Sequence, residues 1–154
     1  MLRSTITTAV IALAIGMTTV ASDAQVKIGF MATMSGPAGG LGQDMYDGFL
    51  LGIEHSGGKL GGQAVEVVKE DDQLKPDLAT QIVQKLIQRD RVSIIAGITF
   101  SNVLLAVLKP VTEKGVFLIG TNAGPAPAAG AACSPFFFST SFQNDNDPEG
   151  MGKY

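Results

Sequence analysis

The chain contains no tryptophan, and only one cysteine and one histidine occur among its 154 residues. A single cysteine, Cys133, cannot form an internal disulfide. Neither Cys133 nor His55 has a second Cys or His at metal-ligand spacing, so the sequence predicts neither a metal site nor a Cys–His nucleophile. We interpret His55 as a surface residue. Cys133 is either a structural or free thiol, or half of a bridge to another part of the protein.

Positive charge is also scarce. The 11 Lys and Arg residues are outnumbered by 14 Asp and Glu residues, which gives a formal net charge of −3. Without a basic stripe or tryptophan, nucleic acid is not an expected partner. The glycine-rich run Gly36–Gly42 lacks the third glycine of a dinucleotide fingerprint and the Gly-Lys-Ser/Thr ending of a phosphate loop. We therefore expect no cofactor, and we do not expect an enzyme.

Long apolar runs are also scarce, and the apolar run near the N-terminus is a short one. Residues 1–24 read as a secretory signal peptide, with Arg3 before an apolar region of roughly residues 9–17 and small residues before a cleavage site after Ala24. The alternative is a permanent membrane anchor. Against it, the apolar run is short for a membrane span and is interrupted by Gly16, Thr18 and Thr19. The expected location is the periplasm, with Gln25 at the new N-terminus.

The rest of the chain alternates short apolar runs with amphipathic segments. Pro76 suits the first turn of a helix, and the apolar positions that follow it recur at helical spacing. Pro110 is expected to kink or shorten a later helix. The expected strands are residues 26–31, 64–68, 92–96, 115–119 and 136–142, with helices near residues 43–55, from residue 76, and at residues 102–114.

This alternation predicts an α/β fold with a doubly wound, mostly parallel sheet and helices on both faces. Asp147-Pro148-Glu149 has the residue types that begin a helix, and the sequence stops at Tyr154 soon afterwards. We therefore expect a signal peptide at residues 1–24 and one lobe at residues 25–142. Residues 143–154 are expected to begin the crossing to a second lobe.

Small-residue turns follow two consecutive strands of the predicted sheet. Residues 97–102, Gly-Ile-Thr-Phe-Ser-Asn, lead into an apolar helix, and residues 121–125, Thr-Asn-Ala-Gly-Pro, follow the next strand. Ser101 is expected to cap the helix, where free backbone N–H groups attract an anion such as a carboxylate. Because neighbouring parallel strands end at the same edge, the two turns predict a binding crevice.

Several stretches, in order, resemble the leucine/isoleucine/valine-binding family of ABC-transporter solute-binding proteins, which have the type I periplasmic-binding fold. The stretch 26–29 with Met34-Ser35-Gly36-Pro37 resembles the family's first strand and loop, and residues 42–48 resemble its first helix. Residues 96–101 and Asn122-Ala123-Gly124 resemble its two ligand loops. The resemblance implies capture of a small carboxylate for an ABC permease in the inner membrane, by a protein that is a monomer when complete.

In that family a serine hydroxyl and loop backbone groups hold the ligand's carboxylate. By position, the resemblance implies Ser101 as this serine, with Ala123 and Gly124 from the second loop and Asn122 beside them. Amino-acid binders usually have a threonine where Gly124 stands. The local sequence resembles a branch that takes up aromatic carboxylates, in which Phe100 contacts a ring and Asn102 bonds the carboxylate.

Each of these residues also has a plain structural interpretation. Ser101 could serve only as a cap, Asn102 as a solvated first-turn residue and Phe100 as part of the core. The segment 35–37 is interpreted as a tight turn and the acidic run 70–72 as a solvated strand end. The alternative function is a ligand-sensing domain of a receptor or regulator, and the ligand is either a branched-chain amino acid or an aromatic acid.

Overall fold

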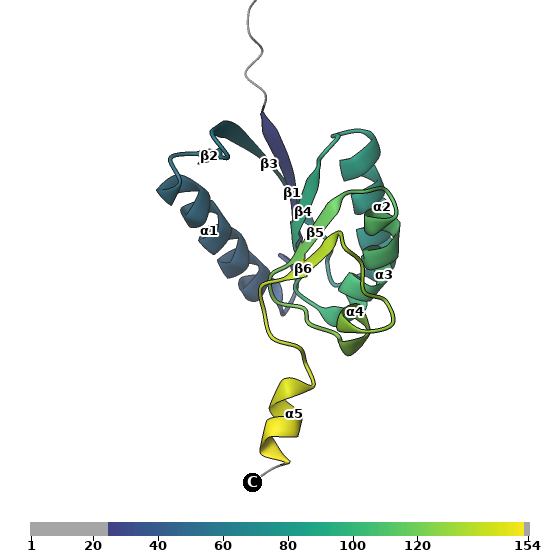
Figure 1. The fold of residues 1–154 in the computed structure, drawn as a ribbon. Coiled ribbons are helices and arrows are strands. Elements are labelled where there is room, and N and C mark those ends of the chain that lie inside the picture. The colour runs from purple at the N-terminus through teal and green to yellow at the C-terminus, as the bar shows by residue number, and fades with distance from the viewer. Residues whose placement is uncertain (1–24, 153–154) are drawn as a thin grey trace, which may run out of the picture.

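The structure, a computed structural model, describes residues 25–152; the predicted signal peptide lies outside the described residues. Its centre is a six-stranded sheet in the order β2-β3-β1-β4-β5-β6 (Figure 1). The strands β3, β1, β4, β5 and β6 run parallel, and only β2 is antiparallel to its neighbour β3. The bounds are Val26–Ala32 (β1), Lys59–Leu60 (β2), Gln63–Asp71 (β3), Ile94–Gly97 (β4), Phe117–Gly120 (β5) and Phe137–Ser139 (β6).

Helices cover both faces of this sheet, which confirms the predicted fold class. Helix α1 (Gly39–His55) lies on one face, whereas α2 (Pro76–Gln88) and α3 (Ser101–Thr112) lie together on the other (Figure 1). Helix α2 connects the parallel strands β3 and β4, and α3 connects β4 and β5, whereas α1 leads from β1 to β3 through the short β2. Two short helices complete the described chain, α4 (Ala126–Ala129) and α5 (Asn146–Met151).

An apolar core lies on each face of the sheet, between the sheet and the helices that cover it. The larger core lies between the sheet and helices α2 and α3, and contains the predicted stripe of α2, with Ile82, Val83 and Leu86 buried. The smaller core lies under α1, where Met45 and Phe49 pack against a cluster that includes the fully buried Phe30. Apolar side chains recur at helical spacing on the helices and alternate along the strands. They therefore meet in the layers between the helices and the sheet, as these two periods predict.

The main boundary error concerns α1, which begins at Gly39 rather than near residue 43. Its first turn runs against the chain after β1: a Cβ on Gly42 would overlap the carbonyl of Thr33, and one on Gly39 would come within 2.8 Å of the Met34 carbonyl oxygen. These glycines allow the close approach that a side chain would block. The glycine-rich composition of residues 39–42 indicated a loop, but packing against the chain after β1 makes them helical.

Other elements also differ from the prediction. The short elements β2 and α4 were not predicted, and β6 covers only three of the seven residues expected at 136–142. Pro110 lies inside α3, which ends two residues later at Thr112. Helix α5 begins at Asn146 with Asp145 as its N-cap, so the predicted cap at Asp147 is wrong by two positions. Among the described residues, no helix is long and apolar enough to cross a bilayer.

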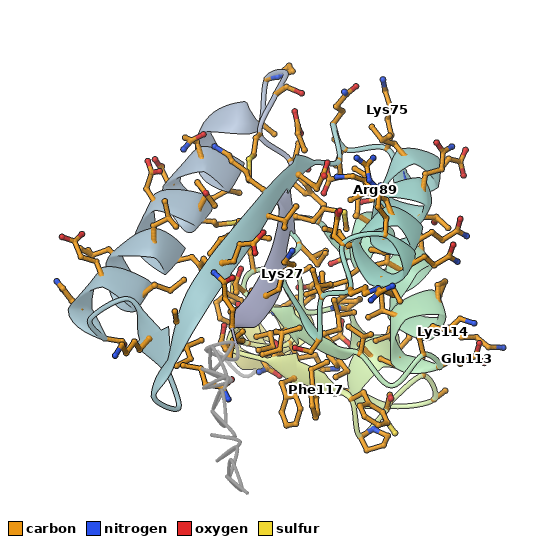
Figure 2. All side chains as sticks on the ribbon, turned by 90° about the horizontal axis from the view of Figure 1, so that it is seen from above. Lys27, Lys75, Arg89, Glu113, Lys114 and Phe117 are labelled. Atoms are coloured by element: carbon orange, nitrogen blue, oxygen red, sulfur yellow. The ribbon has the colours of Figure 1, made fainter. Side chains whose placement is uncertain are left out.

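The sheet edge formed by β5 and β6 carries exposed aromatic side chains. Phe117 is 41% exposed and Phe138 is 53% exposed. Their ring centroids lie 6.1 Å apart, and Phe117 also contacts Phe136. The Phe117 side chain projects from the edge of the molecule (Figure 2). Aromatic contacts thus join the two strands on an exposed surface.

Candidate functional site

The order of the strands reverses beside β1, where β3 and β4 lie on its two sides. The chain moves from β1 to β3 on one side and then returns to place β4 on the other side of β1. In such sheets the loops diverge at this reversal point, and ligands bind in the crevice that they leave. The relevant loops are residues 33–38 after β1, 98–100 after β4 and 121–125 after β5.

The turn between β4 and α3 has an unusual backbone. Gly97 has a φ of +113°, and a Cβ there would overlap the carbonyl of Met31 on the neighbouring strand. Ile98 has a φ of +64°, a left-handed conformation that β-branched residues rarely adopt, and its side chain is fully buried. The Ile98 N–H donates to the Met31 carbonyl oxygen at 2.7 Å, which fixes the turn. Backbone strain of this kind is concentrated at functional sites.

Hydrogen bonds join the three loops through Thr99, a residue that the sequence did not single out. The buried Thr99 hydroxyl oxygen accepts the Thr33 N–H at 3.0 Å, which links the loops after β4 and β1. The Thr99 carbonyl accepts the side-chain amide of Asn122 at 2.7 Å, which links the loops after β4 and β5. The Ala123 N–H also donates to the Ile98 carbonyl at 3.2 Å. The two predicted ligand loops therefore form one connected surface.

Helix α3 begins at this surface, but Ser101 is not its cap. Phe100, half-buried and extended, is the N-cap, and Ser101 is the first helical residue. The first N–H groups of any helix have no intrahelical partner, and they carry the positive end of its dipole. The Ser101 hydroxyl lies beside them and accepts a hydrogen bond from the side-chain amide of Asn144 at 2.9 Å. The N-cap thus lies one residue earlier than predicted, and Ser101 still lies at the helix end that attracts anions.

Gly124 is enclosed by the segment that follows β6. A Cβ at this position would overlap the carbonyl of Phe142, and the Gly124 carbonyl accepts the Asn144 N–H at 2.8 Å. A threonine therefore cannot replace Gly124 without moving residues 142–144. Asn144 contacts both ligand loops, through its backbone to Gly124 and through its side chain to Ser101.

The acidic run at the end of β3 is not a solvated strand end, because Asp72 is fully buried. Its Oδ1 accepts the Thr33 hydroxyl and the Leu74 N–H. Asp71 remains partly exposed, and its Oδ1 accepts the N–H groups of Met34 and Gln73. Burial acts to raise the pKa of Asp71, but these bonds and the Ser35 side chain outweigh it and hold the pKa below its usual value.

The six predicted site residues are thus close together, but they differ in what they can offer. Asn102 and Asn122 are exposed, while Ala123 and Gly124 are buried. The Ala123 N–H is already used within the protein, so it is not free to bind a carboxylate. The sequence did not predict roles for Thr99 and Asn144, because each forms hydrogen bonds with residues far away in the sequence. Their only sequence signal was their place in or near the strand-end loops.

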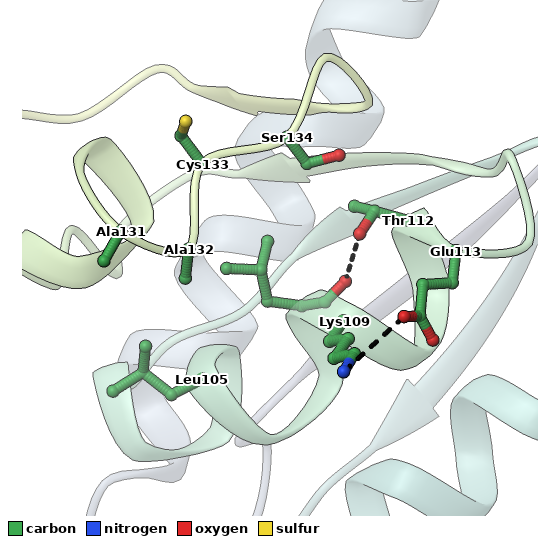
Figure 3. Close-up of a pocket in the computed structure, with 9 residues that line it drawn as sticks. Leu105, Lys109, Thr112, Glu113, Ala131, Ala132, Cys133 and Ser134 are labelled. Atoms are coloured by element: carbon green, nitrogen blue, oxygen red, sulfur yellow. Dashed lines mark hydrogen bonds and ion pairs between the residues drawn. The ribbon is translucent and has the colours of Figure 1, made fainter.

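A separate hollow lies away from these six residues. A cavity of about 460 Å³ is lined by the second half of α3 and the loop 131–134, including the exposed Cys133 (Figure 3). Helix α3 begins at the carboxyl end of β4, so its second half lies toward the opposite end of the sheet. Lys109 and Glu113 form an exposed ion pair there at 3.6 Å. Among residues 25–152, no group of His, Cys, Asp and Glu is arranged to hold a metal ion.

Strand order, helix layers and loop placement define an open α/β sheet of the class that binds ligands at strand ends. Residues 25–154 match the model of the periplasmic binding protein family, and the chain belongs to this family. It is 30% identical over 118 residues to Leu/Ile/Val-binding protein homolog 6 from Brucella abortus, an alignment that covers 76% of this chain and 30% of that relative. The resemblance inferred from the sequence is therefore confirmed.

Solved structures agree with this assignment. An ABC transporter substrate-binding protein from Sphaerobacter thermophilus is 35% identical with a TM-score of 0.75, and the match covers 84% of this chain and 38% of that one. A solute-binding protein of an ABC transporter from R. palustris, solved in complex with benzoate, is 36% identical with a TM-score of 0.76. That match covers 79% of this chain and 34% of the other. The chain thus spans about a third of the length of these relatives.

Proposed function

We propose that this chain is the first lobe of an extracytoplasmic substrate-binding component of an ABC transporter, which captures a small carboxylate for import. Secretion through the predicted signal peptide places it in the periplasm. The ligand is held between this lobe and a second one, and the closed complex is handed to a permease in the inner membrane. The process is capture followed by lobe closure, with no chemical step.

The observation that carries this proposal is the start of α3 at the strand-end crevice. Free N–H groups of the first helical turn and the Ser101 hydroxyl lie on the surface that joins the ligand loops. Backbone donors and a hydroxyl bind a carboxylate through charge-assisted hydrogen bonds without a cationic side chain. Phe100 and Asn102 flank Ser101 in the chain and supply a ring and an amide.

An aromatic acid is favoured over an amino acid as the ligand. An α-ammonium group needs acceptors, and Gly124 has no side chain to provide one. The close approach of the Phe142 carbonyl leaves no space for such a side chain. The R. palustris relative bound to benzoate supports this choice, whereas the Brucella relatives are named for leucine, isoleucine and valine.

NMR titration of the chain from Gln25 onward tests the proposal. Sodium benzoate should shift the backbone amide signals of residues 101–103 more than isoleucine does, and the neutral benzyl alcohol should leave them in place. Ser101→Ala should reduce the benzoate shifts, while Ser93→Ala, at the opposite end of β4, should not. Shifts spread over the surface, or none near residue 101, would refute the proposed site.

The same substitution gives a quantitative expectation for a complete, two-lobed protein. Ser101→Ala should weaken carboxylate binding by roughly 1–3 kcal/mol, the usual cost of removing a hydrogen bond to a charged group. Titration calorimetry measures this difference directly. An unchanged affinity would remove Ser101 from the ligand site.

A further inference from the structure

No motif in the sequence predicts a role for Asn144. It lies five residues beyond the end of β6 and one residue before the N-cap of α5. Its side-chain amide donates to the Ser101 hydroxyl oxygen at 2.9 Å, across 43 residues of sequence. Its backbone N–H donates to the Gly124 carbonyl at 2.8 Å. One residue thus connects the start of α3, the loop after β5 and the segment expected to lead out of the lobe.

We propose that Asn144 is a positioning residue that orients the Ser101 hydroxyl proton toward the ligand. A serine hydroxyl has one proton to donate and two lone pairs that accept. The Asn144 amide occupies a lone pair, so the proton stays free to point elsewhere. A carboxylate only accepts hydrogen bonds, and it therefore needs Ser101 as a donor. Accepting the amide bond also polarises the O–H group and strengthens its donation.

This inference rests on the proposed function and makes it more specific. The second contact of Asn144, to Gly124, holds residues 142–144 against the loop after β5. Because Gly124 has no Cβ, the chain at Phe142 approaches closely enough for both contacts to form at once. The alignment of Ser101 therefore depends on where the segment 142–145 lies. A shift of that segment during lobe movement would release the hydroxyl, so the same residue couples the crossing to carboxylate binding.

Two substitutions distinguish a role of Asn144 in orienting the Ser101 hydroxyl from a purely structural role. Asn144→Ala removes the donor and should weaken benzoate binding by about three- to tenfold, because the Ser101 proton loses its preferred direction. Asn144→Asp replaces the donor with an acceptor, which draws the Ser101 proton away from the ligand and adds a negative charge beside it. It should weaken benzoate binding more than Asn144→Ala. Asn146→Asp adds the same charge to the exposed start of α5 and serves as the matched control.

The decisive measurement is a double-mutant cycle in the chain from Gln25 onward, with sodium benzoate as the probe and backbone amide shifts as the readout. If Asn144 acts through Ser101, Asn144→Ala should have no further effect once Ser101→Ala is present. Additive losses would overturn the inference, as would equal affinity of Asn144→Asp and the unmodified chain.

A failure of the proposed function would look different. In that case benzoate would leave the amides of residues 101–103 unshifted even in the unmodified chain, and the inference would fall with the site. Shifts that are present in the unmodified chain and unchanged in Asn144→Ala would overturn the role of Asn144 alone. A spectrum of Asn144→Ala that differs from the parent only near residues 101, 124 and 144 establishes that the variant is folded.

Discussion

The Thr33 hydroxyl donates a hydrogen bond of 2.5 Å to Oδ1 of Asp72, and both side chains are buried. The same oxygen accepts the Leu74 N–H at 2.8 Å, so one carboxylate fixes the chain after β1 and after β3. The Thr33 N–H in turn donates to the Thr99 hydroxyl oxygen, and Thr99 directly precedes the N-cap of α3. The loops after β1, β3 and β4 are therefore held together by a polar network that begins at Asp72.

Removing this carboxylate should destabilise the fold. Asp72→Ala is expected to lower the free energy of unfolding by about 1–3 kcal/mol, because it leaves the buried Thr33 hydroxyl and the partly buried Leu74 N–H without their acceptor. Asp44→Ala, on the exposed surface of α1, is the control and should change stability by less than about 0.5 kcal/mol. Urea denaturation followed by circular dichroism measures both. Matching midpoints for the two variants would contradict the assigned role of Asp72.

The left-handed turn after β4 should tolerate no side chain at Gly97. Gly97→Ala is expected to destabilise the protein by about 1–3 kcal/mol or more, because its Cβ would overlap the Met31 carbonyl and the backbone φ is unfavourable. Gly52→Ala, in open space within α1, should stabilise by about 0.5–1 kcal/mol. The thermal midpoints should therefore move in opposite directions. A shift of the same sign in both variants would disprove this account of the turn.

Acid should weaken the attachment of the loop after β1 to β3. The pKa of Asp71 is lowered in the folded state, so its stabilising contribution is present above the ordinary value of 3.8 and disappears as the pH falls through the folded value. The unmodified chain should lose stability between about pH 5 and pH 3 more steeply than Asp71→Asn. Thermal unfolding across this range measures the two slopes. Parallel curves would show that Asp71 has no such role.

A side chain at Gly124 should disturb the segment that holds Asn144. Gly124→Ala is expected to cost about 1–3 kcal/mol of stability, since its Cβ would meet the Phe142 carbonyl. Gly48→Ala, within α1, is the control, because a Cβ there would meet no atom within 4 Å. Backbone amide spectra should show changes at residues 142–144 in Gly124→Ala only. Wild-type stability in Gly124→Ala would weaken the argument against a threonine, and with it the preference for an aromatic acid.

The sequence predicts those parts of the fold that local patterns determine. The stripe of α2 and its start at Pro76 follow from helical spacing and backbone chemistry, and both are confirmed. The positions of the two ligand loops follow from parallel strands that end at one edge, and a hydrogen bond from Asn122 to Thr99 joins these loops. Whether their residues contact a ligand stays a prediction.

What the sequence does not reveal depends on partners far along the chain. Asp72 looks like a surface acid until Thr33 and Leu74 are placed around it. Asn144 resembles any polar linker residue, and only the fold brings it to Ser101. The helical start at Gly39 arises because the glycines allow close packing against the chain after β1. Local propensity carries no information about such long-range contacts.

A single lobe should bind its ligand weakly. If closure between two lobes encloses the carboxylate, the chain from Gln25 onward offers only one side of the site and leaves the ligand exposed to water. Titration calorimetry with benzoate should therefore detect no binding in the micromolar range, even though NMR detects local contact. The benzoate-bound R. palustris relative, measured in the same buffer, is the positive control. Micromolar or tighter binding by this chain would mean that one lobe suffices, and the two-lobe mechanism would have to be abandoned.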